Sequence, residues 1–332
     1  AQLVWPAVGV GAGVGSAPGS GPSSPARAVR PRGWSSGSAS CVNVTPYPTV
    51  SVVHGEELGC RTVEDVLAGP AVRDASDPFD LATGPVLRCT VVVLASDCHV
   101  VLLNMHHIAS DGWSCRIFDD ELKQLYEGGD LSPVPFQYAD YAHWQRSAIA
   151  EVIDAQLRYW RTQLGDDHEP ITLPYDRPHP ASASFTASTL VFEVDVDTVA
   201  GLRLVSKEHQ STMFMTVLAV YQLLLHMYSG QHAVNVGCPI AGRSRTEFEG
   251  TVGCFVNTLV FRQLFGTDSG VVTFSDLLAS VKRTCLSAFD NQDVPFEALV
   301  KELQPVRDEK RNPLFQVFFD LDGSAARGRS RW

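Results

Sequence analysis

Two adjacent histidines, followed at a fixed distance by an aspartate and a glycine, are the residues best suited to chemistry in this sequence. They lie in residues 104–114, where His106 and His107 precede Asp111 and Gly112. An imidazole has an ordinary pKa of about 6.5, so it can accept or hold a proton near neutral pH. Asp111 can orient a neighbouring group or pair with an arginine, and Gly112 lets a backbone N–H approach a substrate closely.

The elements around the histidines predict how they are placed. Residues 100–103 are apolar β-formers, Asp111-Gly112 suits a tight turn, and residues 116–126 have helical spacing of apolar side chains. The histidines therefore lie at the end of a strand, where successive side chains point to opposite faces. We expect one imidazole to face a cleft and the other to pack inward.

Each of these residues also has a simpler interpretation. A single histidine at a strand end is more often a packed or surface residue than a catalyst, and Asp-Gly after a strand is usually a turn. Two histidines and an aspartate also raise the alternative of a metal site. We expect no metal, because adjacent strand histidines diverge and zinc sites usually use spaced ligands. The specific signal is the whole pattern HHxxxDG between a strand and a helix.

Composition and charge exclude several classes of protein. The net charge of −11 argues against a general binder of nucleic acids or membrane surfaces. The eight cysteines contain no CxxC pair, so reduced thiols in the cytoplasm are a simpler interpretation than a zinc site or a disulfide framework. The sequence lacks an apolar run of roughly 18 residues or more, so we predict no transmembrane span. The pattern GxSxG occurs only as GWSSG at residues 33–37, inside the predicted leader and not between a predicted strand and helix. We therefore predict no nucleophile elbow and expect no covalent intermediate.

The chain is predicted to consist of a leader and two lobes. Residues 1–42 are rich in Gly, Ala, Ser and Pro and carry no acidic residue, which is typical of a disordered or aberrant leader. Four prolines between residues 170 and 180 form a connector. We place the boundary there, between an N-terminal lobe of residues 43–175 and a C-terminal lobe of residues 176–332.

The pattern of strands and helices predicts an α/β fold. Strands over 86–94 and 99–105 flank Ser96-Asp97 as a hairpin, and the second strand delivers the histidines. The other expected elements are a helix that begins at 136, helices over 150–164, 199–209, 213–228 and 274–289, and strands over 189–194, 233–237, 255–262 and 314–321.

Several motifs are similar, in type and order, to those of condensation domains of nonribosomal peptide synthetases, members of the HHxxxDG acyltransferase superfamily that includes chloramphenicol acetyltransferase. Besides HHxxxDG, the matching stretches are PFDLATGPVLR at 78–88, YADYAHW at 138–144, GCPIAGR at 237–243, GCFVNTL at 253–259, NQDVPFE at 291–297 and RNPLFQV at 311–317. The family's first two motifs are not recognisable and position 291 is Asn where His is usual. We therefore expect a condensation domain that is incomplete at both ends, or whose ends come from a wrong reading frame.

The resemblance implies a fold and an activity. The fold is α/β, with two chloramphenicol-acetyltransferase-like lobes in a V, mixed sheets flanked by helices, and the active site between the lobes near His107. Donor and acceptor peptidyl carrier proteins deliver aminoacyl or peptidyl thioesters on phosphopantetheine, and the acceptor amine attacks the donor carbonyl to form an amide. The domain itself binds no cofactor, and an adenylation domain is a partner in the parent synthetase.

The resemblance also implies roles for individual residues. His107 accepts the amine proton or hydrogen-bonds it, the Gly112 N–H is a candidate oxyanion donor, and His106 and Asp111 hold the site together. The predicted substrate-binding residues are Trp113, Ser114, Asn257 and Arg243. Arg243 is also a candidate partner for Asp111, because the arginine that relatives use lies in the unrecognised opening motifs.

Two alternatives stay open from the sequence. One is an inactive remnant that only docks a carrier protein, and the other is a relative that performs epimerisation or ester formation. Trp113-Ser114 and the later motifs favour condensation over epimerisation. The amino acids joined and the configuration of the donor are not determined by these motifs.

Overall fold

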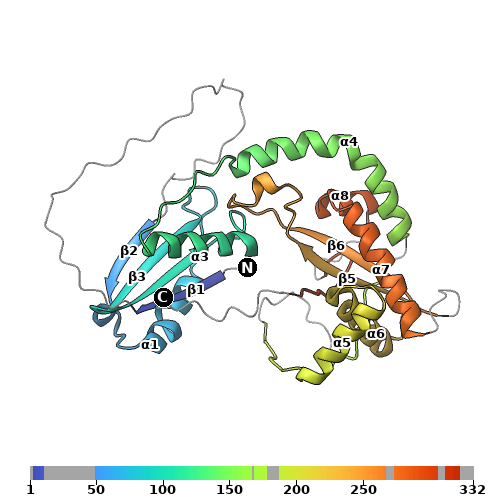
Figure 1. Ribbon diagram of the computed structural model, residues 1–332, viewed down its shortest axis with the longest axis horizontal. Coiled ribbons are helices and arrows are strands. Elements are labelled where there is room, and N and C mark those ends of the chain that lie inside the picture. The colour runs from blue at the N-terminus through green and yellow to red at the C-terminus, as the bar shows by residue number, and fades with distance from the viewer. Residues whose placement is uncertain are drawn as a thin grey trace. The chain divides into compact units, whose positions relative to one another are not determined.

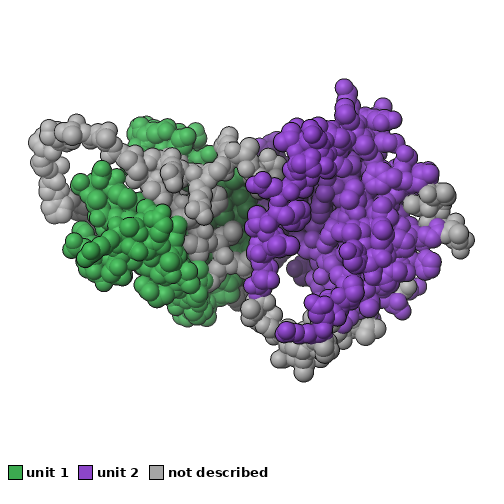
Figure 2. Space-filling model, turned by 90° about the horizontal axis from the view of Figure 1, so that it is seen from below, with its two compact units in different colours: residues 1–133, 252–254, 324–332 green, residues 134–251, 255–323 purple. Residues whose placement is uncertain are grey.

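The structure, a computed structural model, describes residues 3–10, 49–166, 168–177, 187–266, 273–305 and 311–321. They form two compact units, coloured separately in Figure 2. Unit 1 contains the described residues up to Pro133 together with the short segment Val252–Cys254. Unit 2 contains Val134–Thr251 and the described residues from Phe255 on.

The division between the units differs from the predicted boundary at 175/176, because it falls after Pro133. Residues 138–164 form a helix that belongs to unit 2, where Trp160 and Leu164 are fully buried in the core. The prolines in residues 170–180 therefore follow the first helix of unit 2 and do not separate the units.

Unit 1 is built on a mixed four-stranded sheet in the order β1-β4-β3-β2 (Figure 1). Strands β3 (Leu87–Ala95) and β4 (Cys98–Met105) are antiparallel neighbours, which confirms the predicted hairpin. Strand β2 (Thr49–His54) runs parallel to β3 along its other edge. The sheet therefore contains both parallel and antiparallel pairs.

Strand β1 (Leu3–Val10) lies within the segment that was predicted as a leader. It pairs antiparallel with β4, from Leu3 opposite Met105 to Val10 opposite Cys98. Its sequence LVWPAVGV is rich in β-branched and aromatic residues, which favour a strand when an edge is open for pairing. The rest of residues 1–42 lies outside the described part of the chain.

Helices cover the sheet of unit 1. They are η1 (Gly55–Leu58), α1 (Val63–Ala68), α2 (Pro70–Ser76) and α3 (Gly112–Tyr126). Val66 of α1 and Val92, Val100 and Leu102 of the hairpin are almost fully buried in one cluster. The alternate residues of β4 therefore supply the core, and the strand carries the chain directly into the histidines.

Unit 2 has a two-stranded antiparallel sheet of β5 (Ala233–Ile240) and β6 (Asn257–Leu264). The strand predicted over 314–321 is reduced to a single parallel bridge between Gly237 and Phe318. The strand predicted over 189–194 does not form, and Leu190, Val191 and Phe192 are highly exposed. Alternation of apolar residues suits a strand, but a strand forms only where a neighbouring edge pairs with it.

Five helices and one short helix complete the described part of unit 2. They are α4 (Tyr138–Leu164), α5 (Val196–Glu208), α6 (Met213–Ser229), η2 (Thr246–Phe248), α7 (Phe274–Asp290) and α8 (Phe296–Leu303). Helices α6 and α7 lie against β5 and β6 (Figure 1), and Leu218, Val236, Phe261 and Leu278 are buried between them. No single helix in the described ranges is long and apolar enough to cross a membrane.

The architecture confirms the predicted α/β class with mixed sheets flanked by helices. Two predicted helices, one beginning at 136 and one over 150–164, are a single 27-residue helix, α4. No glycine or proline interrupts residues 138–164, so the sequence contains no helix breaker at the expected gap.

Candidate active site

The first histidine of the HHxxxDG motif is held in unit 1 by contacts of both its backbone and its ring. The His106 N–H donates to the carbonyl oxygen of Val86 at 2.9 Å. Its ring Nδ1 accepts from the N–H of Ile108 at 3.0 Å, which requires the proton of a neutral ring to be on Nε2. The ring also meets Phe79 edge-on, with centroids 5.9 Å apart. His106 therefore shapes the turn after β4.

The second histidine has a different neighbour. The Nδ1 atom of His107 lies 3.7 Å from the sulfur of Cys254, within hydrogen-bond range for sulfur. Cys254 belongs to the short segment of unit 1 that comes from far along the chain. Both side chains are half-buried. The two adjacent imidazoles thus contact different groups. They were predicted to lie at the end of a strand, but β4 ends at Met105 and His107 lies in the turn that follows, so strand alternation does not account for their divergence.

Asp111 acts as the N-cap of α3. Its backbone is extended, with φ −133° and ψ −179°, and its Oδ1 accepts from the Ser114 N–H at 2.8 Å. An N-cap carboxylate satisfies a helix donor that has no partner within the helix. Asp111 is 3% exposed, so this contact is made away from solvent. Gly112 is the first residue of α3 and is exposed.

Ser114 joins the start of α3 to the segment Val252–Cys254. Its hydroxyl lies 2.8 Å from Asp111 Oδ1 and 2.9 Å from the carbonyl oxygen of Gly253, either of which can accept its single proton. The hydroxyl also accepts from the Gly253 N–H at 3.0 Å. Ser114 is fully buried. It was predicted to bind substrate, and in the structure its polar atoms make these contacts within unit 1.

Trp113 contacts a neighbouring residue on α3. The guanidinium carbon of Arg116 lies 4.9 Å from the centre of the Trp113 ring, in a cation–π geometry. The Trp113 side chain is half-buried. Its predicted role in substrate binding stays a prediction.

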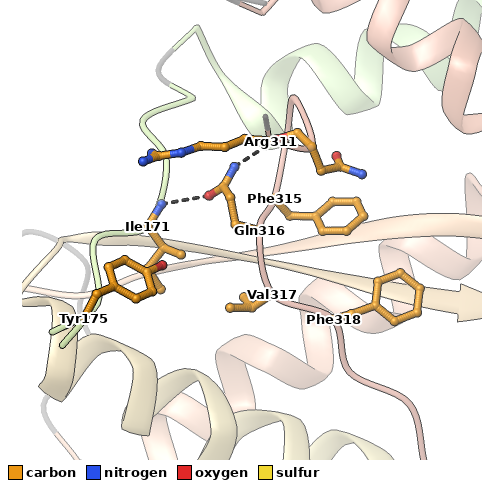
Figure 3. Close-up of a pocket in the computed structure, with 8 residues that line it drawn as sticks. Ile171, Tyr175, Arg311, Phe315, Gln316, Val317 and Phe318 are labelled. Carbon is orange, nitrogen blue, oxygen red and sulfur yellow. Dashed lines mark hydrogen bonds between the residues drawn. The ribbon is translucent and has the colours of Figure 1, made fainter. Parts of the chain in front are cut away.

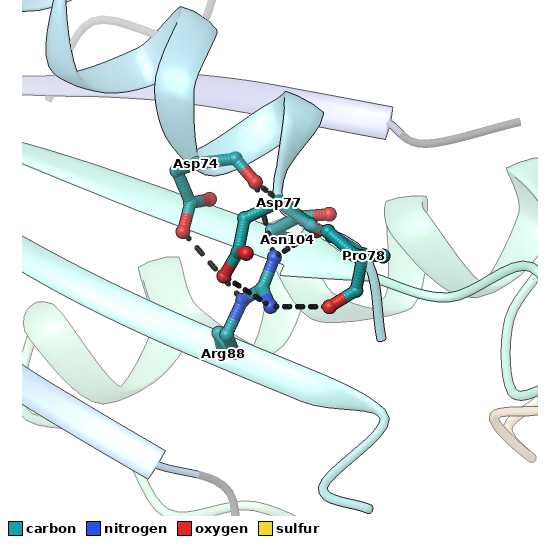
Figure 4. Close-up of polar contacts among 5 residues, drawn as sticks. All are labelled: Asp74, Asp77, Pro78, Arg88 and Asn104. Atoms are coloured by element: carbon teal, nitrogen blue, oxygen red, sulfur yellow. Dashed lines mark hydrogen bonds and ion pairs between the residues drawn. The ribbon is translucent and has the colours of Figure 1, made fainter. Parts of the chain in front are cut away.

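An arginine anchors the loop that supports His106 (Figure 4). The guanidinium of Arg88 donates to the carbonyl oxygens of Asp74, Asp77 and Pro78, and pairs with the carboxylates of Asp74 and Asp77 at 3.6 and 3.1 Å. Its guanidinium carbon also lies 4.1 Å from the centre of the Phe79 ring. Because Phe79 contacts the His106 ring, Arg88 helps to fix the surroundings of the first histidine.

Arg243 and Asn257 belong to unit 2, where each anchors backbone. Arg243 Nη1 donates to the carbonyl oxygens of Phe248 and Thr251, both at 2.6 Å, and its guanidinium lies over the Phe255 ring. Asn257 Nδ2 donates to Gln292 O and Val294 O, both at 2.9 Å, and its Oδ1 accepts from the Phe296 N–H. These contacts shape loops of unit 2, and the predicted substrate-binding roles stay predictions.

An aromatic cluster lies beside Arg243 in unit 2. Tyr141 packs against Phe248 and Phe255, with ring centroids 5.3 and 4.5 Å apart. Burial raises the pKa of Tyr141 to about 12, so this phenol stays neutral near pH 7. The tyrosine/aspartate/tryptophan motif at 138–144 therefore supplies core residues of unit 2.

A cavity of about 250 Å³ also lies in unit 2, beside the bridge at Phe318 (Figure 3). Gln316 stands in its wall, where Oε1 accepts from the Ile171 N–H at 2.8 Å and Nε2 donates to Asn312 O. The predicted site residues do not line it. This cavity is therefore separate from the HHxxxDG turn.

Sequence reasoning did not single out two residues that the structure places in the surroundings of the histidines, Cys254 and Arg88. Cys254 stands in the matching motif at 253–259, yet only contact across a separation of 147 residues shows that it faces His107. Arg88 is the last residue of the matching motif at 78–88. The aspartates at positions 74 and 77, close to it in sequence, could have indicated that it forms ion pairs. In the described part of the chain, no three or more His, Cys, Asp or Glu side chains gather as a metal site would require.

Comparison with known proteins identifies a matching family and similar synthases. The profile of the family described as Condensation domain matches residues 59–326. A linear gramicidin synthase of Brevibacillus parabrevis is 45% identical over 259 residues, which cover 76% of this chain and 3% of that protein. Gramicidin S synthase 2 of Brevibacillus brevis is 42% identical over 245 residues, which cover 74% of this chain and 5% of that protein. The chain thus spans a small fraction of the length of these relatives.

Solved structures show the same fold. A four-domain nonribosomal peptide synthetase, holo-AB3403 bound to AMP and glycine, matches 84% of this chain and 21% of its own, with a TM-score of 0.73 and 24% identity. The X-domain from teicoplanin biosynthesis matches 83% of this chain and 60% of its own, with a TM-score of 0.71 and 26% identity. The first match concerns the fold alone.

Proposed function

We propose that this chain, which belongs to the condensation-domain family of nonribosomal peptide synthetases, forms an amide bond between a donor thioester and an acceptor amine. Condensation domains are acyltransferases, and peptide bond formation is their standard activity. The family works with phosphopantetheine-carrying partners. The chain carries the intact HHxxxDG motif of this family at residues 106–112.

The proposal is supported by the different contacts that the polar side chains of residues 106–114 make. His106, Asp111 and Ser114 use their polar atoms to build the turn and the start of α3. His107 is half-buried, and its contact with Cys254 uses Nδ1. The second ring nitrogen, Nε2, is then the group of this motif that we assign to the substrate amine.

The reaction forms one C–N bond, breaks one C–S bond and transfers one proton from the amine to the leaving thiolate. The neutral amine of the acceptor attacks the donor carbonyl, a C–N bond forms, and the C–S bond to the donor phosphopantetheine breaks. His107 accepts the proton that the amine loses, and the departing thiolate receives a proton. General-base action of this kind typically contributes about 10²–10⁴-fold to the rate.

Positioning supplies a further part of the acceleration. Correct alignment of two reactants corresponds to effective concentrations of about 10⁵–10⁸ M in favourable cases. The Gly112 N–H lies in the first turn of α3, where backbone donors lack partners within the helix and the helix dipole favours negative charge. We assign it to the developing oxyanion, a role worth about 3–4 kcal/mol where one donor has been removed elsewhere.

The partners follow from the same proposal. Donor and acceptor peptidyl carrier proteins present their substrates on phosphopantetheine, and an adenylation domain of the parent synthetase loads them. Trp113, Asn257 and Arg243 are proposed to contribute to substrate binding, directly or through the loops that they anchor. The proposed compartment is the cytoplasm, where such thioester carriers are made and used.

A single-turnover assay tests the proposal. Carrier proteins loaded with a donor and an acceptor amino acid are mixed with the chain, and the dipeptidyl carrier is quantified. The His107→Ala variant should lose about 10²–10⁴-fold in rate. His54→Ala provides a matched control, because His54 is an exposed histidine of unit 1 at the end of β2. Equal rates for His107→Ala and the control would contradict the assigned role.

A docking function is a second candidate, favoured by one observation. The X-domain that this chain resembles at 26% identity has also been solved in a complex with OxyB, so a protein of this fold binds a partner protein. The inactive alternative predicts that the folded chain binds a loaded carrier protein and yields no dipeptide. The single-turnover assay, combined with a carrier-binding measurement, separates the two functions.

A further inference from the structure

A thiol stands beside the imidazole that the proposed reaction uses. The sulfur of Cys254 lies 3.7 Å from Nδ1 of His107. Sulfur is a weak hydrogen-bond acceptor and a thiol is a weak donor, so the pair can bond in either direction. The direction determines which ring nitrogen carries the proton, and therefore which one can accept a proton from a substrate.

The position of Cys254 is determined by the backbone next to it. The N–H and the carbonyl oxygen of Gly253 lie 3.0 and 2.9 Å from the buried hydroxyl of Ser114. Asp111 Oδ1 lies 2.8 Å from the same hydroxyl and caps α3. The hydrogen bond from the Gly253 N–H to Ser114 holds the backbone of Gly253 at this position, whichever of the two oxygens accepts the hydroxyl proton. The next side chain, Cys254, is thus placed against the motif by contacts that do not involve its own thiol.

Other cysteines of the chain have a different environment. Cys115 is buried in α3, and Cys285 is fully buried in the core of unit 2. Burial raises the pKa of the Cys115 thiol, and it raises that of Cys285 to about 12. These thiols are small apolar core residues in practice. Cys254 is half-buried and has an imidazole as its neighbour, so its surroundings are those of a polar contact.

We propose that Cys254 is a positioning residue for His107, whose sulfur accepts the Nδ1–H hydrogen bond and keeps Nε2 unprotonated for the substrate amine. The inference rests on the proposed function and deepens it, because it assigns the group that orients the general base. The neutral imidazole carries one proton, so its presence on Nδ1 leaves the lone pair on Nε2. His106 has the opposite arrangement, because its Nδ1 accepts from the Ile108 N–H.

Two substitutions at Cys254 separate the hydrogen bond from the volume of the side chain. Cys254→Ala removes the acceptor, and the single-turnover rate should fall about threefold to tenfold, the effect of losing one neutral hydrogen bond. Cys254→Ser restores an acceptor and should recover most of the rate. Cys98→Ala is the matched control, since Cys98 is a half-buried thiol at the start of β4. A Ser variant as slow as the Ala variant would overturn the proposal.

A measurement that needs no activity reports the proton directly. Nitrogen-15 chemical shifts of histidine rings distinguish a protonated Nδ1 from a protonated Nε2, and the His107→Ala spectrum assigns the His107 signals. The native chain should show His107 with its proton on Nδ1, and Cys254→Ala should move population to the Nε2–H form. A native His107 protonated on Nε2, or unchanged shifts in Cys254→Ala, would overturn the proposal.

The two proposals fail in different ways. If the native chain forms no dipeptide while the nitrogen shifts behave as expected, the proposed function fails and the contact between Cys254 and His107 remains. If the native chain is active and Cys254→Ala is as fast as the Cys98→Ala control, the positioning role fails alone. An acyl group found on Cys254 by mass spectrometry after incubation with the donor carrier would also overturn it, because the sulfur would then be a nucleophile.

Discussion

Replacing Asp111 with alanine should loosen the start of α3, in addition to any effect on the chemistry of the motif. The structure gives Asp111 a helix-capping contact, in which Oδ1 accepts from the Ser114 N–H at 2.8 Å. The side chain is 3% exposed and Ser114 is fully buried, so water cannot easily replace the lost acceptor. The expected effect is therefore larger than that of an exposed cap.

The magnitude follows from the contact that is lost. Removal of an N-cap side chain costs about 0.5–2 kcal/mol, and a buried donor left without a partner costs about 1–3 kcal/mol. Both estimates describe the same N–H, so they are not added, and we expect a loss of about 1–3 kcal/mol for Asp111→Ala. Asparagine caps helices nearly as well as aspartate, so Asp111→Asn should lose only the interaction of the charge with the helix dipole, about 0.3–1 kcal/mol.

Hydrogen exchange followed by mass spectrometry measures this effect locally. Amides in the first turns of α3 exchange through local opening, so a loss of about 1–3 kcal/mol should reduce their protection roughly 5- to 140-fold. Asp111→Asn should reduce it less than about fivefold. Asp130→Ala, an exposed aspartate after the end of α3, is the matched control and should leave these amides unchanged.

Two outcomes would refute this account of Asp111. If asparagine is as damaging as alanine, the negative charge of the aspartate matters and the capping geometry does not. If alanine leaves the protection of α3 unchanged, the cap contributes nothing to the stability of the helix. Either result would return Asp111 to a purely electrostatic or catalytic role.

The remaining predictions concern the support of His106 and the response to alkaline pH. Arg88→Lys keeps the charge but loses the planar guanidinium that donates to three carbonyl oxygens. Urea denaturation should therefore show a free energy of unfolding that is about 1–3 kcal/mol smaller than in the native chain. An equal decrease for Arg73→Lys, at an exposed arginine of α2, would contradict this reasoning. Burial raises the pKa of Tyr159 to about 12, above the ordinary value of about 10, so the folded state holds more protons between these pH values. The free energy of unfolding should therefore decrease as the pH rises from 10 toward 12. In the same series of denaturation measurements, the Tyr159→Phe variant should show a smaller decrease.

Local features of the sequence determined the elements that carry the motif. The hairpin was visible because two β-forming runs flank a short turn, and β3 and β4 have the predicted pairing. Helices α3, α6 and α7 were predicted because apolar residues recur at helical spacing over more than three turns. These features depend on residues close together in sequence, so their physical causes can be read there.

Three predictions differ from the structure because pairing and burial are not local. The segment 189–194 alternates like a strand, yet its apolar residues are exposed and the described residues provide it no strand partner. The segment 314–321 forms only one bridge, at Phe318. In contrast, β1 forms within a segment of linker-like composition, because it pairs along β4.

The candidate site combines both kinds of information. The sequence by itself determined the HHxxxDG pattern and its position between a strand and a helix. The divergence of His106 and His107 comes from the turn after β4 and not from strand alternation. Only the tertiary structure decided that Gly253 binds Ser114 across 139 residues and that Cys254 stands at the Nδ1 atom of His107. Hydrogen bonds between such distant residues depend on how the whole chain closes on itself, and no local spacing encodes them.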